Sequence, residues 1–144
     1  MKKSEWNREL LFTYKATIEI LENIANKTIF KYKKLKTIEL FDYKDYPTWC
    51  DGHIEIGYNN DPQSLAHELA HGLHEKIREA NHDNKYGEEF SDAIRYFVEE
   101  KILPESTWSK SNRNNPILKE CNFNLQNFIE KLNSKDFFNN IGWP

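Results

Sequence analysis

Five consecutive residues near the middle of the chain have the types and spacing of a hydrolytic metal site. They read His67-Glu68-Leu69-Ala70-His71, an HExxH sequence. Residues four apart on a helix share one face, so two imidazoles at this spacing can bind one metal ion. The Glu beside the first His then lies at the edge of that face. Its carboxylate can take a proton from a metal-bound water as that water attacks a carbonyl.

A third metal ligand must come from elsewhere, because a catalytic zinc ion usually has three protein ligands and one water. Glu88 is the preferred candidate, since it opens a second predicted helix in the run Glu88-Glu89-Phe90-Ser91-Asp92. Asp92 lies one turn further on, where it could accept a hydrogen bond from a ligand imidazole and fix its tautomer. Glu89 points about 100° away from Glu88 and is a weaker candidate.

The segment between the two predicted helices adds two polar side chains. His82 is an alternative third ligand, a second group in the catalytic cleft or an exposed loop residue. Tyr86 is a poor metal ligand and is better suited to donate a hydrogen bond to a developing oxyanion.

A metzincin site, HExxHxxGxxH, needs Gly at position 74 and His at position 77. The chain has His74 and Ile77 there, which excludes that class.

The motif helix is predicted to be amphipathic. Its apolar stripe lies nearly opposite His67 and His71 at about 100° per residue, so the stripe should lie in the core and the two imidazoles should not. The imidazoles could face solvent or a cleft, and we expect a cleft because the motif occurs on a helix that follows a strand and a cap. Asp61 and Pro62 are typical of a helix start, and the helix should run to about Ala80. The stripe consists of Leu65, Leu69, Leu73 and Ile77.

The remaining elements are predicted from apolar periodicity. Helices are expected at residues 4–26, with Ser4 as N-cap, at 88–103, ending before Pro104, and at 116–132. Residues 105–115 read as a polar loop. Two strands are expected, Thr37–Phe41 and His53–Tyr58, with turns between them. This order predicts an α+β fold with a small, mostly antiparallel sheet.

Composition narrows the class of protein. The chain has 144 residues, which fits one domain, and aromatic residues make up 14% of it. Its net charge of −3 makes nucleic acid an unlikely partner. Two cysteines cannot form a Cys-only zinc site.

We expect no membrane association and a cytoplasmic location, since no signal or membrane segment is recognisable; export by a signal-independent route stays open.

The motifs resemble those of the gluzincin metallopeptidases, which include thermolysin and the catalytic domain of anthrax lethal factor; in size the chain resembles the minigluzincins. The resemblance covers about residues 52–104 and rests on the HExxH run and on Glu88-Glu89-Phe90-Ser91-Asp92-Ala93. It implies that His67, His71 and Glu88 bind zinc and that Glu68 is the general base. It further implies that Asp92 accepts a hydrogen bond from one of the ligand imidazoles. It also implies a substrate paired with an edge strand, and His53–Tyr58 occupies the matching place.

Two other protease families share parts of the pattern. Tyr86-Gly87-Glu88-Glu89-Phe90 is similar to the H-G-x-E-F element of SprT-like proteases, with Tyr where that family has a ligand His. Ile102-Leu103-Pro104 is similar to the L-L-x-P ending of repressor-cleaving HExxH proteases. These families would imply cleavage of DNA-associated proteins. A non-catalytic zinc-binding or interaction module is the alternative from a different class.

The sequence thus predicts a single zincin-like domain, residues 1–144, with an N-terminal helix, a small sheet, the HExxH helix, a glutamate helix and a C-terminal helix. The predicted activity is that of a zinc metalloendopeptidase with one Zn²⁺ per chain and Glu68 as general base. Tyr86 or His82 would stabilise the oxyanion. The expected partner is a peptide or protein substrate, and a monomer is favoured. The site should lie between the two helices and the strand His53–Tyr58.

Overall fold

Six helices and one three-stranded sheet make up the part of the chain that the computed structural model describes, residues 1–81 and 87–134. The α+β class is therefore confirmed. Among the described helices, none combines the length and the apolar character that a membrane crossing requires. The helices are α1 (Lys3–Lys27), α2 (Ser64–Asn81), α3 (Gly87–Ile102), α4 (Thr107–Ser111), α5 (Pro116–Glu120) and α6 (Leu125–Leu132); the strands are β1 (Thr37–Phe41), β2 (Thr48–Cys50) and β3 (His53–Gly57).

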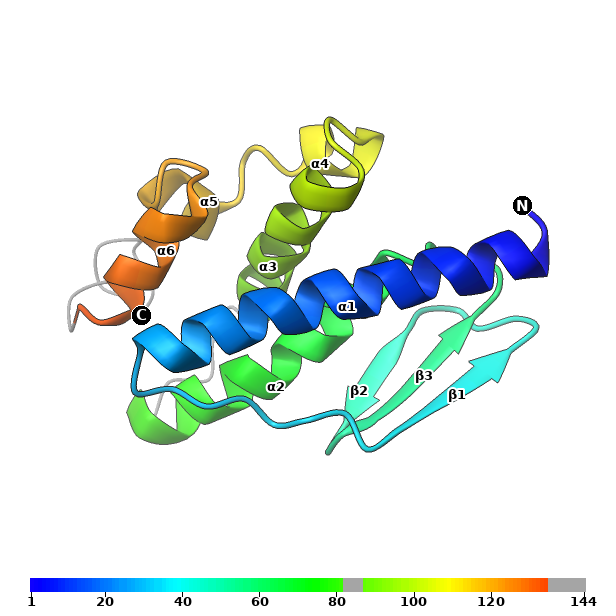
Figure 1. Ribbon diagram of the computed structural model, residues 1–144, viewed down its shortest axis with the longest axis horizontal. Coiled ribbons are helices and arrows are strands. Elements are labelled where there is room, and N and C mark those ends of the chain that lie inside the picture. Colours follow the sequence, from blue (N-terminus) through cyan, green and yellow to red (C-terminus); the bar gives the residue numbers. More distant parts are fainter. Residues whose placement is uncertain (82–86, 135–144) are drawn as a thin grey trace.

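Helix α1 crosses the whole molecule, with the sheet and α2 below it and α3 to α6 above it in the view of Figure 1. Ser4 was expected to cap this helix, and that prediction is wrong. The helix begins at Lys3, and Lys2 is the cap residue, with extended backbone and no side-chain hydrogen bond. Leu11 of this helix is half exposed. The buried face of α1 consists of Trp6, Thr13, Ala16, Thr17, Ile20, Leu21, Ile24 and Ala25.

The sheet is mixed rather than mostly antiparallel. Its strand order is β1-β3-β2, with β1 parallel and β2 antiparallel to the central strand β3. The sequence prediction missed β2, which has only three residues. A two-residue turn at Asp51 and Gly52, both with positive φ (49° and 89°), joins β2 to β3. The chain reverses direction between β1 and β2 and again between β2 and β3, so β1 and β3 run parallel.

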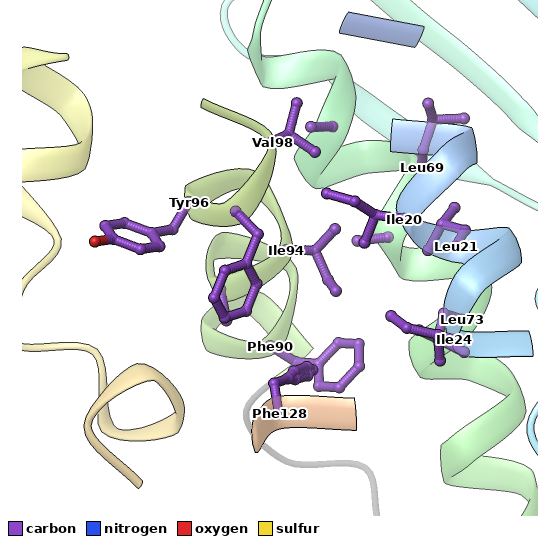
Figure 2. Packing of buried hydrophobic residues seen from close by; sticks show 14 of the residues in the cluster. Ile20, Leu21, Ile24, Leu69, Leu73, Phe90, Ile94, Tyr96, Val98 and Phe128 are labelled. Carbon is purple, nitrogen blue, oxygen red and sulfur yellow. The ribbon is translucent and has the colours of Figure 1, made fainter. Parts of the chain in front are cut away.

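The apolar stripe of α2 is buried, as predicted. Leu65, Leu69, Leu73 and Ile77 are at most 2% exposed. Figure 2 shows Leu69 and Leu73 beside the apolar face of α1, with Phe90 and Ile94 of α3 lying across the same core. Burial of this many large side chains fixes α2 against α1 and α3, since each contributes roughly 1.5–3 kcal/mol. The opposite face of α2 is therefore held in a defined orientation.

The start of α2 differs from its prediction. Asp61 to Gln63 form a tight turn, in which Ser64 N donates to Asp61 O (3.0 Å) and Leu65 N donates to Pro62 O (3.2 Å). The helix begins only at Ser64. The Asp61 carboxylate lies 3.5 Å from Nη2 of Arg95 on α3. Asp61 thus connects the start of α2 to the neighbouring helix instead of capping its own.

Residues 107–132 contain three short helices where a loop and one long helix were expected. Ser106 caps α4 by accepting a hydrogen bond from Ser109 N. The predicted helix 116–132 is interrupted between α5 and α6, where Asn122 and Phe123 have positive φ (55° and 56°). This break turns α6 so that Phe128 packs edge-to-face on Phe90, with ring centroids 5.6 Å apart (Figure 2).

Candidate metal centre and active site

The two imidazoles of the motif lie one turn apart on the face of α2 opposite the apolar stripe. The ring centroids of His67 and His71 are 4.8 Å apart, and their Nε2 atoms are 3.2 Å apart. Both rings are partly buried along a cleft. The expectation that they line a cleft rather than the core is therefore confirmed.

Glu88 joins the two imidazoles from the first turn of α3. Its Oε2 lies 2.8 Å from Nε2 of His67, and its Oε1 lies 3.2 Å from Nε2 of His71. Gly87 permits this approach, because a Cβ at that position would lie 3.0 Å from two atoms of the His74 ring on α2. Because glycine has no side chain, the first turn of α3 can lie directly against α2.

The other ring nitrogen of each imidazole, Nδ1, also has a polar partner. His67 Nδ1–H donates to Asp92 Oδ1 at 2.7 Å, as the sequence predicted. Nδ1 of His71 lies 3.3 Å from the Ser91 hydroxyl. With both Nδ1 atoms engaged, both Nε2 atoms point toward the same space. Sequence reasoning missed Ser91, although its place directly before Asp92 and three residues after Glu88 was the available signal.

A zinc ion fits this donor set. Zn–N and Zn–O bonds of 2.0–2.2 Å in a tetrahedral site place neighbouring ligand atoms about 3.3–3.6 Å apart. The distances among the two Nε2 atoms and the Glu88 oxygens are 2.8–3.2 Å, slightly less than a bound ion would set. Two imidazoles and one carboxylate also form a ligand set typical of catalytic zinc. His67, His71 and Glu88 could therefore hold the metal with only small movements.

Glu68 is the remaining carboxylate at the centre. Its Oε2 lies 3.6 Å from Nε2 of His67, and donor atoms of His67, Glu68 and His71 lie within 4.8 Å of one another. Burial raises the pKa of Glu68 to about 6. A carboxylate with a pKa close to neutrality is suited to accept and return a proton.

The charges at the centre depend strongly on one another. Burial alone lowers the pKa of His67, but hydrogen bonds to Asp92 and Glu88 outweigh it and raise that pKa to about 9. Hydrogen bonds from His67 and His71 hold the pKa of Glu88 well below its usual range. Without metal, the centre therefore pairs a protonated His67 imidazole with the ionised carboxylate of Glu88. A bound cation would replace that proton.

A cavity of about 700 Å³ extends from this centre, and strand β2 forms one wall of it through Thr48 and Trp49. The sequence prediction assigned that wall to His53–Tyr58, which is wrong. Those residues contain β3, the central strand, whose two edges are already paired. Trp49 is fixed at the wall by a hydrogen bond from Nε1 to Glu75 Oε1 of α2, at 2.8 Å.

The other candidates lie differently. Of the two adjacent glutamates, Glu88 is the one within hydrogen-bonding distance of both imidazoles, whereas the backbone carbonyl of Glu89 accepts from Asn115 Nδ2 at 2.8 Å. His74 is buried and packs on Phe90, with ring centroids 5.5 Å apart. His82 and Tyr86 lie outside the described residues.

Comparisons with models of protein families, with curated proteins and with solved structures find no match for the chain.

Proposed function

We propose that this protein is a zinc-dependent peptidase with a zincin-like active-site arrangement. One observation carries the proposal: Glu88 lies 2.8 and 3.2 Å from the Nε2 atoms of His67 and His71, which are themselves 3.2 Å apart. The two imidazoles come from α2 and the carboxylate from α3. Asp92 orients the imidazole of His67 through a hydrogen bond to Nδ1. An ion pair between Glu88 and the imidazoles that served stability alone would not require a further carboxylate, that of Glu68, to be buried beside them.

Zinc bound at this centre would lower the pKa of its water toward neutrality and polarise a substrate carbonyl. The chain supplies the proton transfers. Glu68 accepts the proton of the attacking water and then delivers it to the nitrogen of the leaving amine. Its pKa of about 6, raised by burial, matches both steps near neutral pH. Asp92 keeps the Nε2 atom of His67 directed at the centre.

The substrate class follows from the wall of the cavity. Strand β2 is at the end of the strand order, so its outer edge can pair with an extended peptide. Thr48 and Trp49 of this strand border the same cavity as the proposed catalytic carboxylate of Glu68. An extended peptide on β2 would pass directly beside Glu68 and the two imidazoles. The proposed reaction is therefore cleavage within an extended stretch of polypeptide.

Metal removal tests this proposal. A library of quenched fluorescent peptides is incubated with the purified chain before and after treatment with a chelator, and after addition of one equivalent of zinc. The expected result is cleavage that the chelator abolishes and zinc restores. Cleavage that continues unchanged in the zinc-free chain would contradict the proposal, and so would no cleavage of any peptide by the zinc-loaded chain.

A further inference from the structure

The sheet carries a second group of metal-binding side chains on the face turned away from the core. Ile54 and Ile56 of β3 are fully buried, so His53 and Glu55, which alternate with them, point to the opposite face. Residues paired across strands share a face. The register pairs Glu39 of β1 with Glu55 and Cys50 of β2 with His53. All three strands thus contribute to this outer face of the sheet.

Three donor atoms converge on the outer face. Nε2 of His53 lies 3.3 Å from Glu55 Oε2 and 3.9 Å from Glu39 Oε1, and the three residues offer donor atoms within 4.8 Å of one another. Nδ1 of His53 lies 2.6 Å from the Thr37 hydroxyl. When Nδ1–H donates to that hydroxyl, the lone pair of Nε2 points at two carboxylates. A cation between them would remove this repulsion.

The hairpin turn adds a thiol next to the imidazole. Cys50-Asp51-Gly52-His53 is a Cys-x-x-His sequence closed by the two-residue turn. Cys50 is a free, exposed cysteine directly opposite His53, and such cross-strand Cβ atoms lie about 4.5–5.5 Å apart. Turning about its Cα–Cβ bond can direct the thiol toward the ring. Thiolate and imidazole together favour zinc over magnesium or calcium.

Neighbouring lysines contact one carboxylate of this group and the aspartate of the turn. Lys44 Nζ lies 2.9 Å from Glu55 Oε1, so Oε2 is the oxygen that faces His53. The carboxylate of Asp51, at the tip of the turn, pairs with Lys33 and Lys36. Asp51 is thereby held away from the cluster, and Lys44 offsets one of the two carboxylate charges.

We propose that the outer face of the sheet binds a second divalent cation of the zinc class through His53 Nε2, Glu39 and Glu55, with the Cys50 thiolate as fourth ligand. Such an ion would link all three strands and would be structural, since no buried carboxylate of the kind represented by Glu68 lies among the residues of this cluster. The proposal does not depend on the peptidase function.

Metal titration in a chain without the helix site tests the proposal. In the full chain carrying His67→Asn and His71→Asn, cobalt(II) is added as the probe, and zinc content is measured after dialysis. We expect one equivalent of either metal, and a thiolate-to-cobalt charge-transfer absorption. Adding His53→Asn should remove the binding, and adding Glu39→Gln should weaken it at least tenfold. Stoichiometry that is the same with and without His53 would overturn the proposal.

Two controls separate the possible outcomes. Cys50→Ser should abolish the charge-transfer absorption, and its persistence would refute the thiolate ligand. In the otherwise unchanged chain, His53→Asn should reduce zinc from two equivalents to one and leave peptide cleavage unchanged. If the wild-type chain binds one equivalent that His53→Asn removes, the helix site has failed and the sheet site stands. Because His53 is partly exposed, we expect its replacement to leave the fold intact. A thermal melt of each variant checks that the variant folds.

Discussion

Two groups of histidine and glutamate lie in the part of the chain that the structure describes, one between helices and one on a sheet, and they differ in how firmly they are held. The helix group has side chains of His67 and His71 that are 13% and 18% exposed. In the sheet group, His53 is 39% exposed and Glu39 is 56% exposed. The difference lies in the imidazoles, because Glu88 of the helix group is itself 74% exposed; solvent and salt therefore weaken the attraction of a cation more at His53 than at His67 and His71.

The two groups also differ in their supporting contacts. In the helix group, Asp92 and Ser91 lie behind the two imidazoles, and Glu88 bridges both Nε2 atoms. In the sheet group, one imidazole faces two carboxylates at 3.3 and 3.9 Å. Preorganised donors lose less freedom on binding. We therefore expect tighter binding and chemistry at the helix group, and weaker, structural binding at the sheet group.

The largest effect should come from Glu68→Gln. The amide is nearly the same size as the carboxylate but cannot accept the proton, so peptide cleavage should fall about 10²–10⁴-fold, with the zinc content unchanged. The measurement is kcat/KM on one peptide identified from the library. Glu75→Gln is the matched control, because Glu75 borders the same cavity yet contacts Trp49. Equal losses in both variants would refute the general-base role.

The next effect should come from Glu88→Ala, which removes a proposed ligand. Zinc affinity should fall by more than the roughly 10–100-fold that is typical of loss of an outer partner. Glu89→Ala is the control, since it removes the neighbouring carboxylate from the same turn of α3. Competition with a zinc indicator dye measures both. A larger loss for the Glu89 variant would show that the assignment of the third ligand is wrong.

Asp92→Asn should have a smaller effect, because it weakens the support of an imidazole and leaves the ligands in place. Zinc affinity should fall about 10–100-fold. The same substitution should leave the sheet group unaffected, so cobalt binding there serves as an internal control. An Asp92 variant with wild-type zinc affinity would show that His67 is oriented without its hydrogen-bonded partner.

The smallest effect should come from a change of one pH unit, which alters zinc affinity through the proton on His67. The metal must displace the proton that Asp92 and Glu88 favour on His67, whose pKa is raised to about 9. Affinity should therefore rise with pH, by up to about tenfold per pH unit, and level off above about pH 9. Calorimetric titrations at several pH values measure the slope. An affinity that is constant between pH 6 and 8 would contradict the proton displacement.

The parts of the site that could be predicted follow helix periodicity. The spacing of His67 and His71, the buried stripe opposite them, and the spacing from Glu88 to Asp92 all depend on local helical geometry. That geometry is the same in any context, so these residues could be assigned from the sequence. The approach of α3 to α2 was only implied by the family resemblance, because it depends on packing between distant segments and on Gly87.

The parts that could not be predicted depend on short or irregular segments. Strand β2 has three residues, too few for an alternating pattern to be recognised, so the wall of the cavity was assigned to the wrong strand. The break between α5 and α6 requires positive φ at Asn122 and Phe123. Phe123 is an unusual residue for that conformation, and packing of Phe128 in the core compensates. Neither feature has a strong local signal.

Anomalous diffraction from crystals grown with zinc tests the central claim most directly. The account predicts a peak within about 2.2 Å of Nε2 of His67, Nε2 of His71 and a carboxylate oxygen of Glu88. A zinc peak elsewhere in the cavity with that space empty, or no peak between α2 and α3 at saturating zinc, would contradict it.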